Sequence, residues 1–346
     1  MTTQVLWMEG FDTRHPNVQI FDATGGTVVN DEAPEAGREL RLSSGASARW
    51  SLPPTSGSFW FGQRMRRVSG QPGLNSHVQR AMAILLGGNT TNTALTLLYR
   101  RNGSVDDWQI EIRIGEDIGS APAQDYLGEF WRTAGNVIPP GGADVTVEIT
   151  RGATDGGFRL IVDNVQLLAE EGIAELADSE GDLTGMSYTA GSSTSSSMIQ
   201  AFDDQWVADG NLGSARIVAI IPNAVGFYSQ GTPSGTGDNY EQLNDVPPSD
   251  AEHVTFGAGD KDTYGWDTSA LTAVNALRCA AVMLQPRFEG TSTVKCIARI
   301  DGTDHTLGEV TNAAFETGRL IVPGNPDTLD LWTAADIAAA EFGLEA

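Results

Sequence analysis

Two adjacent carboxylates come closest to a pattern that could do chemistry. Asp203 and Asp204 stand in the run Phe-Asp-Asp-Gln-Trp-Val. A pair of carboxylates can cleave a glycosidic bond when the two groups lie about 5–10 Å apart across a cleft. On a strand, neighbouring side chains point to opposite faces, so both could reach one bond only if a bulge redirected one of them. We expect one aspartate to hydrogen-bond loop backbone at the rim of the fold, with calcium binding and acid/base catalysis as the alternatives.

A second group of residues combines acidic and aromatic side chains. Asp260, Asp262, Tyr264 and Trp266 alternate along one short segment. Aromatic rings stack on the apolar faces of sugars and carboxylates accept hydrogen bonds from hydroxyls, so these four are our candidates for surface binding. The alternative, which we favour, is that Tyr264 and Trp266 are core residues of a strand with period two.

No other catalytic or metal-binding motif is visible. The sequence contains no His-Glu-x-x-His, no Cys-x-x-Cys and no Gly-x-Ser-x-Gly. A Ser-His-Asp triad that meets only in space would leave no mark in sequence order. We therefore predict no catalytic residue, no cofactor and no metal, and a structural calcium ion has no supporting motif. The histidines, none of them at ligand or relay spacing, are His15, His77, His253 and His305.

The two cysteines lie in separate apolar runs. Cys279 and Cys296 could form a disulfide if their runs paired as neighbouring strands. Secreted scaffolds that depend on disulfides carry far more cysteine than this. We expect buried free thiols.

Charge and length restrict the class of protein. The chain has 346 residues and a formal net charge of -24, which disfavours nucleic acid and anionic membrane surfaces as partners. Its N-terminus has no basic region, and no apolar run approaches the roughly 18 residues of a membrane span. We expect synthesis in a bacterial cytoplasm and no membrane insertion.

The positioning elements are predicted to be strands. Apolar residues alternate with polar ones in Trp108–Ile114, and again from Val145 to Ile149 and from Phe158 to Val162. Helical patterns are confined to 167–176 and to 333–341, where Thr333 and Asp336 fit a capping box. The sequence predicts an all-β protein of two β-sandwich domains of jelly-roll type, 1–210 and 211–346, with few short helices.

The order of several motifs resembles a known family. Residues 198–210 resemble the closing strand of the concanavalin-A-like, laminin-G-like jelly rolls of phage structural proteins. Residues 215–224, 244–250 and 331–344 resemble the second β-domain that follows it in that family. The resemblance implies a virion protein of a tailed bacteriophage, located on the virion, and it implies no catalytic residue.

Three functions compete on this basis. The first is a fibre, spike or tail-tip component that attaches the virion to the host surface, and the second is a capsid or tail decoration protein. A polysaccharide-cleaving enzyme is the third and least favoured. Other virion proteins, a host surface glycan and further copies of the chain are the expected partners, with a trimer as the first choice of homo-oligomer. Three aromatics that look exposed support self-association, namely Trp60, Trp131 and Trp332.

Overall fold

The computed structural model shows a chain that divides into two compact units. It describes residues 5–9, 24–30, 38–55, 57–69, 78–86, 93–101, 108–114, 130–135, 137–139, 142–177, 182–189, 199–245, 251–271, 278–279, 282–284, 292–312 and 320–346. Of the described residues, those from Leu6 to Ile217 form the N-terminal unit, and those from Val218 to Ala346 form the C-terminal unit together with Val5. The division falls between Ile217 and Val218, whereas the sequence favoured 210/211; independent folding of the two parts stays a prediction.

The N-terminal unit is built on one large antiparallel sheet. Its strands run in the order β11-β10-β9-β4-β13-β3-β12-β5-β6-β7-β8, with β1 added to β13 and β2 added to β3. Their bounds are β1 Val5–Glu9, β2 Thr24–Asn30, β3 Arg38–Thr55, β4 Phe59–Ser69, β5 Val78–Leu86, β6 Thr93–Arg101, β7 Trp108–Ile114, β8 Phe130–Arg132, β9 Ala143–Arg151, β10 Gly156–Val162, β11 Val165–Ile173, β12 Leu183–Thr189 and β13 Ile199–Ala208.

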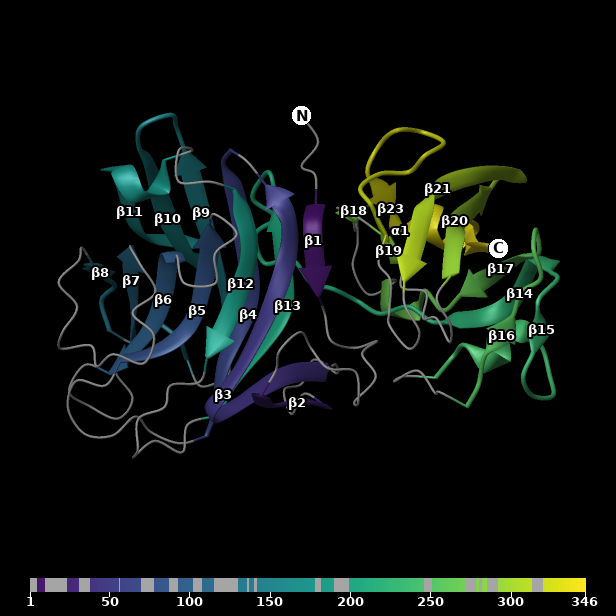
Figure 1. Ribbon diagram of the computed structural model, residues 1–346, viewed down its shortest axis with the longest axis horizontal. Helices are drawn as coiled ribbons and strands as arrows, with labels where there is room; N and C mark the ends of the chain where they lie inside the picture. The colour runs from purple at the N-terminus through teal and green to yellow at the C-terminus, as the bar shows by residue number, and fades with distance from the viewer. Residues whose placement is uncertain are drawn as a thin grey trace. The chain divides into compact units, whose positions relative to one another are not determined.

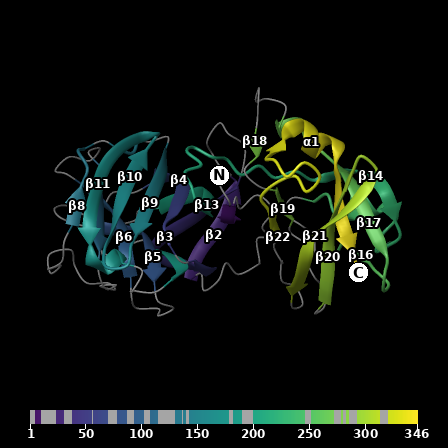
Figure 2. The same cartoon turned by 90° about the horizontal axis from the view of Figure 1, so that it is seen from above.

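This sheet folds over on itself and encloses a core. Trp131 on β8, at one end of the strand order, meets the Phe158 ring of β10 edge-on with centroids 5.1 Å apart. Its indole Nε1 donates to Glu170 of β11 at 3.1 Å. The two ends of the strand order therefore lie against each other, as Figure 1 and Figure 2 show for β8 and β11. The result is a β-sandwich whose core includes residues of β4, β6, β7, β9 and β10.

The C-terminal unit contains a five-stranded antiparallel sheet in the order β14-β17-β24-β20-β21. These strands are β14 Pro222–Ser229, β17 Lys261–Trp266, β20 Ser292–Ile300, β21 Thr303–Asn312 and β24 Glu341–Glu345. Three short pairs accompany them: β15 Thr232–Pro233 with β16 Val254–Thr255, β18 Arg278–Cys279 with β23 Trp332–Thr333, and β19 Val282–Leu284 with β22 Leu320–Val322. Among the described residues, the helical elements of this unit are α1 Ala334–Ala339 and the 3-10 turns Asn239–Gln242 and Ser269–Leu271, and the N-terminal unit has the 3-10 turn Ala174–Leu176.

One face of the five-stranded sheet is covered by β22, β23 and α1, and these elements leave its other face uncovered. Ala298 and Phe342 point into a core that also holds Val322, Trp332 and Ile337, from β22, β23 and α1. Residues one position away along the strands, such as Arg299 and Glu341, then belong to the outer face, because side chains alternate on a strand. The site described below lies on this outer face.

Most local predictions agree with the structure. The all-β prediction is confirmed, and Ile110, Ile112, Val145 and Val147 are buried as their alternation requires. The capping box also forms, because the Thr333 side chain accepts from Asp336 N while the Asp336 carboxylate accepts from Thr333 N.

Three local predictions need correction or completion. Residues 167–176 are not helical, since β11 pairs along β10 and only Ala174–Leu176 form a 3-10 turn. Trp332 is fully buried, so it supports no self-association, while Trp60 and Trp131 are half-buried. Cys296 is a free buried thiol, and burial raises its pKa to about 11.

Within the described ranges, no helix is long and apolar enough to cross a membrane.

Candidate functional site

A bulge in the edge strand β14 raises two aromatic residues over the outer face of the C-terminal sheet. Val225 pairs with Tyr264 and Ser229 pairs with Asp262, so three residues of β14 stand opposite Thr263 alone. Gly226 opens the bulge, and a Cβ there would lie 2.4 Å from the Thr263 carbonyl oxygen. Only glycine fits such a close backbone approach. The extra length is taken up by Phe227 and Tyr228.

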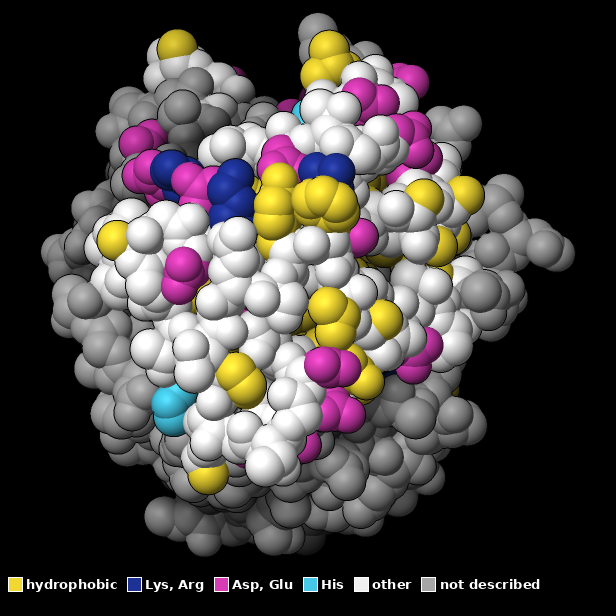
Figure 3. All heavy atoms as spheres, turned by 90° about the vertical axis from the view of Figure 1, so that its right-hand side faces the viewer, with side chains coloured by type: hydrophobic (Ala, Val, Ile, Leu, Met, Phe, Trp, Pro, Cys, Tyr) yellow, Lys and Arg dark blue, Asp and Glu magenta, His cyan; other side chains and the backbone are white. Residues whose placement is uncertain are grey.

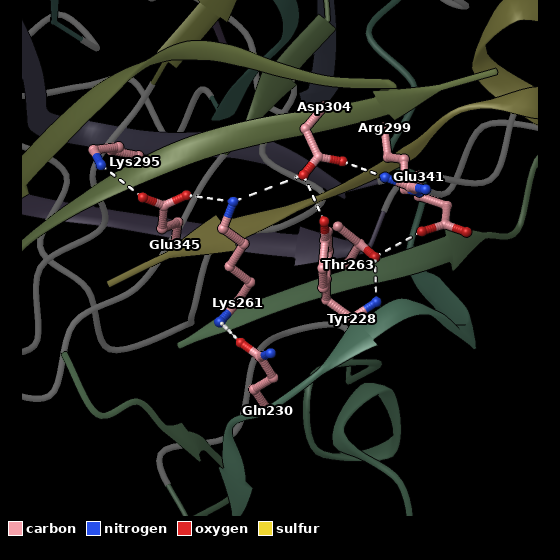
Figure 4. A network of polar contacts seen from close by, with 9 residues as sticks. All are labelled: Tyr228, Gln230, Lys261, Thr263, Lys295, Arg299, Asp304, Glu341 and Glu345. Carbon is pink, nitrogen blue, oxygen red and sulfur yellow. Dashed lines mark hydrogen bonds and ion pairs between the residues drawn. The ribbon is translucent and has the colours of Figure 1, made fainter. Parts of the chain in front are cut away.

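Side chains of the sheet hold the backbone of this bulge in place. The Tyr228 amide donates to Thr263 Oγ1 at 3.2 Å, and the Phe227 amide donates to Glu341 Oε2 at 2.7 Å. Thr263 Oγ1 in turn donates to the same Glu341 oxygen at 2.6 Å. Figure 4 shows the Glu341, Thr263 and Tyr228 part of this chain of contacts. Strand amides that the bulge removes from the backbone ladder thus find side-chain acceptors, which fixes the aromatic pair.

Phe227 is exposed, Tyr228 is half-buried, and both rings are stacked against cations. Phe227 is 64% exposed, although phenylalanine is normally a core residue. The Arg299 guanidinium lies 3.9 Å from the centre of its ring, and the Tyr228 ring meets it edge-on at 4.9 Å. The Lys261 ammonium lies 5.4 Å from the centre of the Tyr228 ring. Both distances between cation and ring fit a cation–π contact.

Ion pairs fix these cations across the sheet. Asp304 accepts from the Tyr228 hydroxyl at 2.7 Å and from Arg299 Nη1 at 2.5 Å. Burial alone would raise the pKa of Asp304, but the hydrogen bonds from Tyr228 and Arg299 lower it. Glu345 bridges Lys261 at 2.8 Å and Lys295 at 2.6 Å, and the hydrogen bonds from these two lysines lower its pKa. Both carboxylates are therefore held ionised at neutral pH.

These residues form a continuous surface. We call it the aromatic face, and it consists of Phe227, Tyr228, Gln230, Lys261, Lys295, Arg299, Asp304, Glu341 and Glu345. Figure 3 shows hydrophobic side chains lying directly beside Lys and Arg side chains on the side of the molecule where this sheet is exposed. The arrangement is an aromatic platform held by hydrogen bonds and bordered by paired charges, which is suited to binding.

Loss of the Glu341 side chain should loosen the bulge. The Glu341→Ala variant leaves the Phe227 amide and the Thr263 hydroxyl without their acceptor, which we expect to cost about 1–3 kcal/mol of unfolding free energy. Hydrogen exchange of the Phe227 amide should become faster, as measured by NMR or mass spectrometry. Glu309→Ala, which removes an exposed glutamate from β21 of the same sheet, should change neither quantity. Unchanged exchange in Glu341→Ala would contradict this account of the bulge.

The sequence candidates on β17 lie beneath the aromatic face or beside it. Asp262 is 0% and Tyr264 4% exposed, so neither offers a side-chain surface to a ligand. The favoured prediction for Tyr264, that it is a buried residue of a strand, agrees with its position. Trp266 is half-buried and packs against the core residue Phe342 with ring centroids 6.3 Å apart. Asp260 is half-buried and accepts from Gly257 N at 2.7 Å, and its role in binding stays a prediction.

Asp262 instead anchors the loop that follows β14. Its Oδ1 accepts from the amides of Gln230 and Gly231 at 2.5 and 2.8 Å. Its Oδ2 accepts from Asn239 Nδ2 and, at 2.9 Å, from the Tyr264 hydroxyl. Burial raises the pKa of Tyr264, and the neighbouring Asp262 charge raises it further. Asp262 therefore connects β17 to the segment that carries the bulge.

The Asp203–Asp204 pair has a structural role through Asp204. A register shift interrupts β13 between Asp203 and Trp206, and Asp204 takes a φ of 50° there. Asp204 Oδ1 accepts from Ile217 N at 2.7 Å, and Oδ2 lies 3.5 Å from Arg216 Nε. The prediction that one aspartate hydrogen-bonds loop backbone is confirmed. Among the residues that the structure describes, no group of three or more His, Cys, Asp or Glu could hold a metal ion.

Sequence reasoning missed the aromatic face. One signal was present, since a glycine inside a strand pattern marks a bulge or a close backbone approach, and Gly226 precedes Phe227 and Tyr228 directly. The residues that hold the pair come from β17, β20, β21 and β24, which are distant in sequence. No spacing rule connects residues so far apart.

Comparison with known proteins yields only low similarity. No family model and no curated protein matches the sequence. Among solved structures, a legume lectin-like domain from Entamoeba histolytica is 12% identical with a TM-score of 0.38, covering 60% of this chain and 98% of its own. The CBM2 module of the evolved Dit of Lactobacillus casei BL23 phage J-1 is 13% identical with a TM-score of 0.35, covering 60% of this chain and 96% of its own.

A third similar structure also comes from a phage. The carbohydrate esterase of Shiga toxin-encoding bacteriophage phi24B is 12% identical with a TM-score of 0.37, covering 60% of this chain and 100% of its own. The similar structures thus include phage proteins and a lectin-like domain. Because all three TM-scores lie below 0.5, they assign neither a family nor an activity to this chain.

Proposed function

We propose that this chain is a non-catalytic binding protein of a tailed-phage virion that attaches the particle to the host surface through the aromatic face. The observation that carries the proposal is the exposure of Phe227 on a braced bulge. Burying such a side chain would contribute about 1.5–3 kcal/mol to folding, and this contribution is largely lost at 64% exposure. A fold that holds Phe227 outward with hydrogen bonds and a stacked guanidinium has a binding surface ready before its partner arrives.

A non-catalytic role fits the state of the acidic groups. Asp304, Glu341 and Glu345 all accept hydrogen bonds from neighbours on the sheet. A glycosidase needs one carboxyl group that carries a proton and a second that acts as base or nucleophile across a cleft. The lowered pKa of Asp304 and of Glu345 leaves neither able to carry that proton at neutral pH. The carboxylates of Asp304 and Glu345 are therefore suited to binding rather than to bond cleavage.

The place on a virion rests on the sequence resemblance of residues 198–210 and 215–224 to phage structural proteins. Phage appendages present repeated copies in closed symmetry, so we propose that the chain acts as a homo-oligomer, with a trimer as the first choice. Several copies of one small aromatic surface raise the overall affinity without any new contact. Contact with other virion subunits through the same face, as in a decoration protein, is the alternative outcome of the test below.

Truncation of Phe227 tests the proposal. The fluorescently labelled full chain should bind cells of its host bacterium, and Phe227→Ala should weaken this binding at least about tenfold, as expected for a central aromatic contact. Phe130→Ala is the matched control, because Phe130 is 45% exposed and also stacks under an arginine, with Arg132 4.2 Å from its ring centre. Equal cell binding by wild type and Phe227→Ala would exclude attachment through this face, and a wild type that does not bind cells would leave decoration as the role of the protein.

A further inference from the structure

We infer that the aromatic face binds an uncharged glycan, with one sugar ring stacked on Phe227. The inference rests on the proposed function and names its ligand. Phe227 presents a rigid ring that is 64% exposed, with Arg299 stacked on it and Tyr228 against it. The C–H groups on one face of a pyranose pack on such a ring, and the surrounding polar groups can meet its hydroxyls.

The apolar area is too small for the core of a protein interface. Stable protein–protein contacts bury about 800 Å² per partner around a hydrophobic centre. Among the described residues of β14, β17, β20, β21 and β24, the exposed large hydrophobics are Val225 and Phe227, both on β14. Ion pairs begin directly beside Phe227, at Arg299 and Asp304. One ring bordered by polar groups matches a sugar in size better than it matches a protein surface.

The polar border supplies both donors and acceptors to hydroxyl groups. Lys261 and Asp304 are 29% and 28% exposed at the side chain, and Lys295 is 44% exposed. Gln230, which is exposed, accepts from Lys261 N at 2.8 Å through Oε1 and carries two amide N–H donors besides. These groups are already fixed by their mutual contacts, so little side-chain entropy would be lost when a sugar hydroxyl joins them.

Charge selects a neutral ligand. The aromatic face carries three cations, Lys261, Lys295 and Arg299, and they are balanced by three carboxylates, Asp304, Glu341 and Glu345. The chain as a whole has a net charge of -24. An acidic polysaccharide would therefore find no net positive charge at the face and would be repelled by the rest of the protein.

Treatment of host cells separates the glycan from other receptors. We expect periodate, which oxidises vicinal diols of sugars, to abolish binding of the labelled full chain, and we expect proteinase K to leave binding intact. The neutral fraction of the host's surface polysaccharide, separated from the acidic fraction by anion exchange, should compete with cells for the protein. The acidic fraction should not compete. Phe227→Ala should lose at least about tenfold in affinity for the neutral fraction, while Phe227→Trp should retain binding because indole also stacks on sugars.

The outcomes distinguish this inference from the function on which it rests. Suppose that Phe227→Ala impairs cell binding. If proteinase K treatment of the cells then abolishes binding of the wild type, or if the acidic fraction competes, attachment through this face stands and the neutral glycan is wrong. If Phe227→Ala leaves cell binding unchanged, attachment through this face and the glycan both fail. Loss of binding in Phe227→Trp as well as in Phe227→Ala would overturn stacking as the mode of recognition.

Discussion

Replacement of Asp262 by alanine is expected to destabilise the C-terminal unit by at least about 3 kcal/mol. The carboxylate is fully buried and accepts from two backbone amides, one side-chain amide and one hydroxyl. Each buried donor that loses its acceptor lowers the unfolding free energy by about 1–3 kcal/mol. A water molecule that enters the site and accepts from these donors recovers part of this loss. Because Asp262 ties β17 to the segment after the bulge, the variant should also weaken cell binding. Denaturant unfolding of the full chain, with the two units followed separately by hydrogen exchange, measures the effect.

Asp330→Ala serves as the control for this substitution. Asp330 is an exposed aspartate of the same unit, and its removal should change the unfolding free energy by less than about 0.5 kcal/mol. Exchange in the N-terminal unit should be the same in both variants. A loss of less than about 1 kcal/mol in Asp262→Ala would mean that water replaces the carboxylate fully and that the loop after β14 is held by other contacts.

The strands of this protein could be predicted where the apolar side chains all lie on a single face. In Trp108–Ile114 the period of two is regular, because Ile110, Ile112 and Ile114 face the sandwich core. The short helix that the ambiguous period of 167–176 allowed is not formed. That segment is largely exposed, so its apolar residues carry no clear period, and pairing with β10 decides its conformation.

The candidate site could be predicted only in part, because its residues meet through tertiary contacts. The sequence points to 259–266 for its acids and aromatics, but the structure buries Asp262 and Tyr264, where they support the loop after β14. The exposed ring comes from β14 instead. The contact from the Phe227 amide to Glu341 spans 114 residues and that from Tyr228 to Asp304 spans 76. Composition and period contain no information on which distant strands become neighbours.

A buried charged cluster in the N-terminal unit carries the second large expected effect. Glu111 is 0% and Arg113 is 6% exposed, and they form an ion pair at 2.6 Å. Glu111 also pairs with Arg132 of the adjacent edge strand β8 at 2.5 Å. Removing the carboxylate takes the Glu111 counter-charge away from the buried guanidinium of Arg113. Breaking a buried pair from one side in this way costs about 3–5 kcal/mol, which is our expectation for Glu111→Ala.

The pH dependence of this loss gives a sharper test than its size. Burial alone would raise the pKa of Glu111, but hydrogen bonds and charge from Arg132 and Arg113 outweigh it and lower the pKa. A group with a lowered folded-state pKa contributes fully above its unfolded value, about 4.3 for glutamate, and the contribution is lost as pH falls through the folded value. The stability gap between wild type and Glu111→Ala should therefore be constant from about pH 6 to 8 and shrink below about pH 4.

Denaturant unfolding at pH 7, 4 and 3 would measure that gap, with Glu171→Ala as the control. Glu171 is an exposed glutamate of β11 in the same unit, and its removal should change stability little at any of these pH values. A gap for Glu111→Ala that stays constant down to pH 3 would show that its cost comes from lost packing rather than from lost charge. A gap that shrinks would place the ionised carboxylate, held between Arg113 and Arg132, among the groups that keep β7 and β8 together at neutral pH.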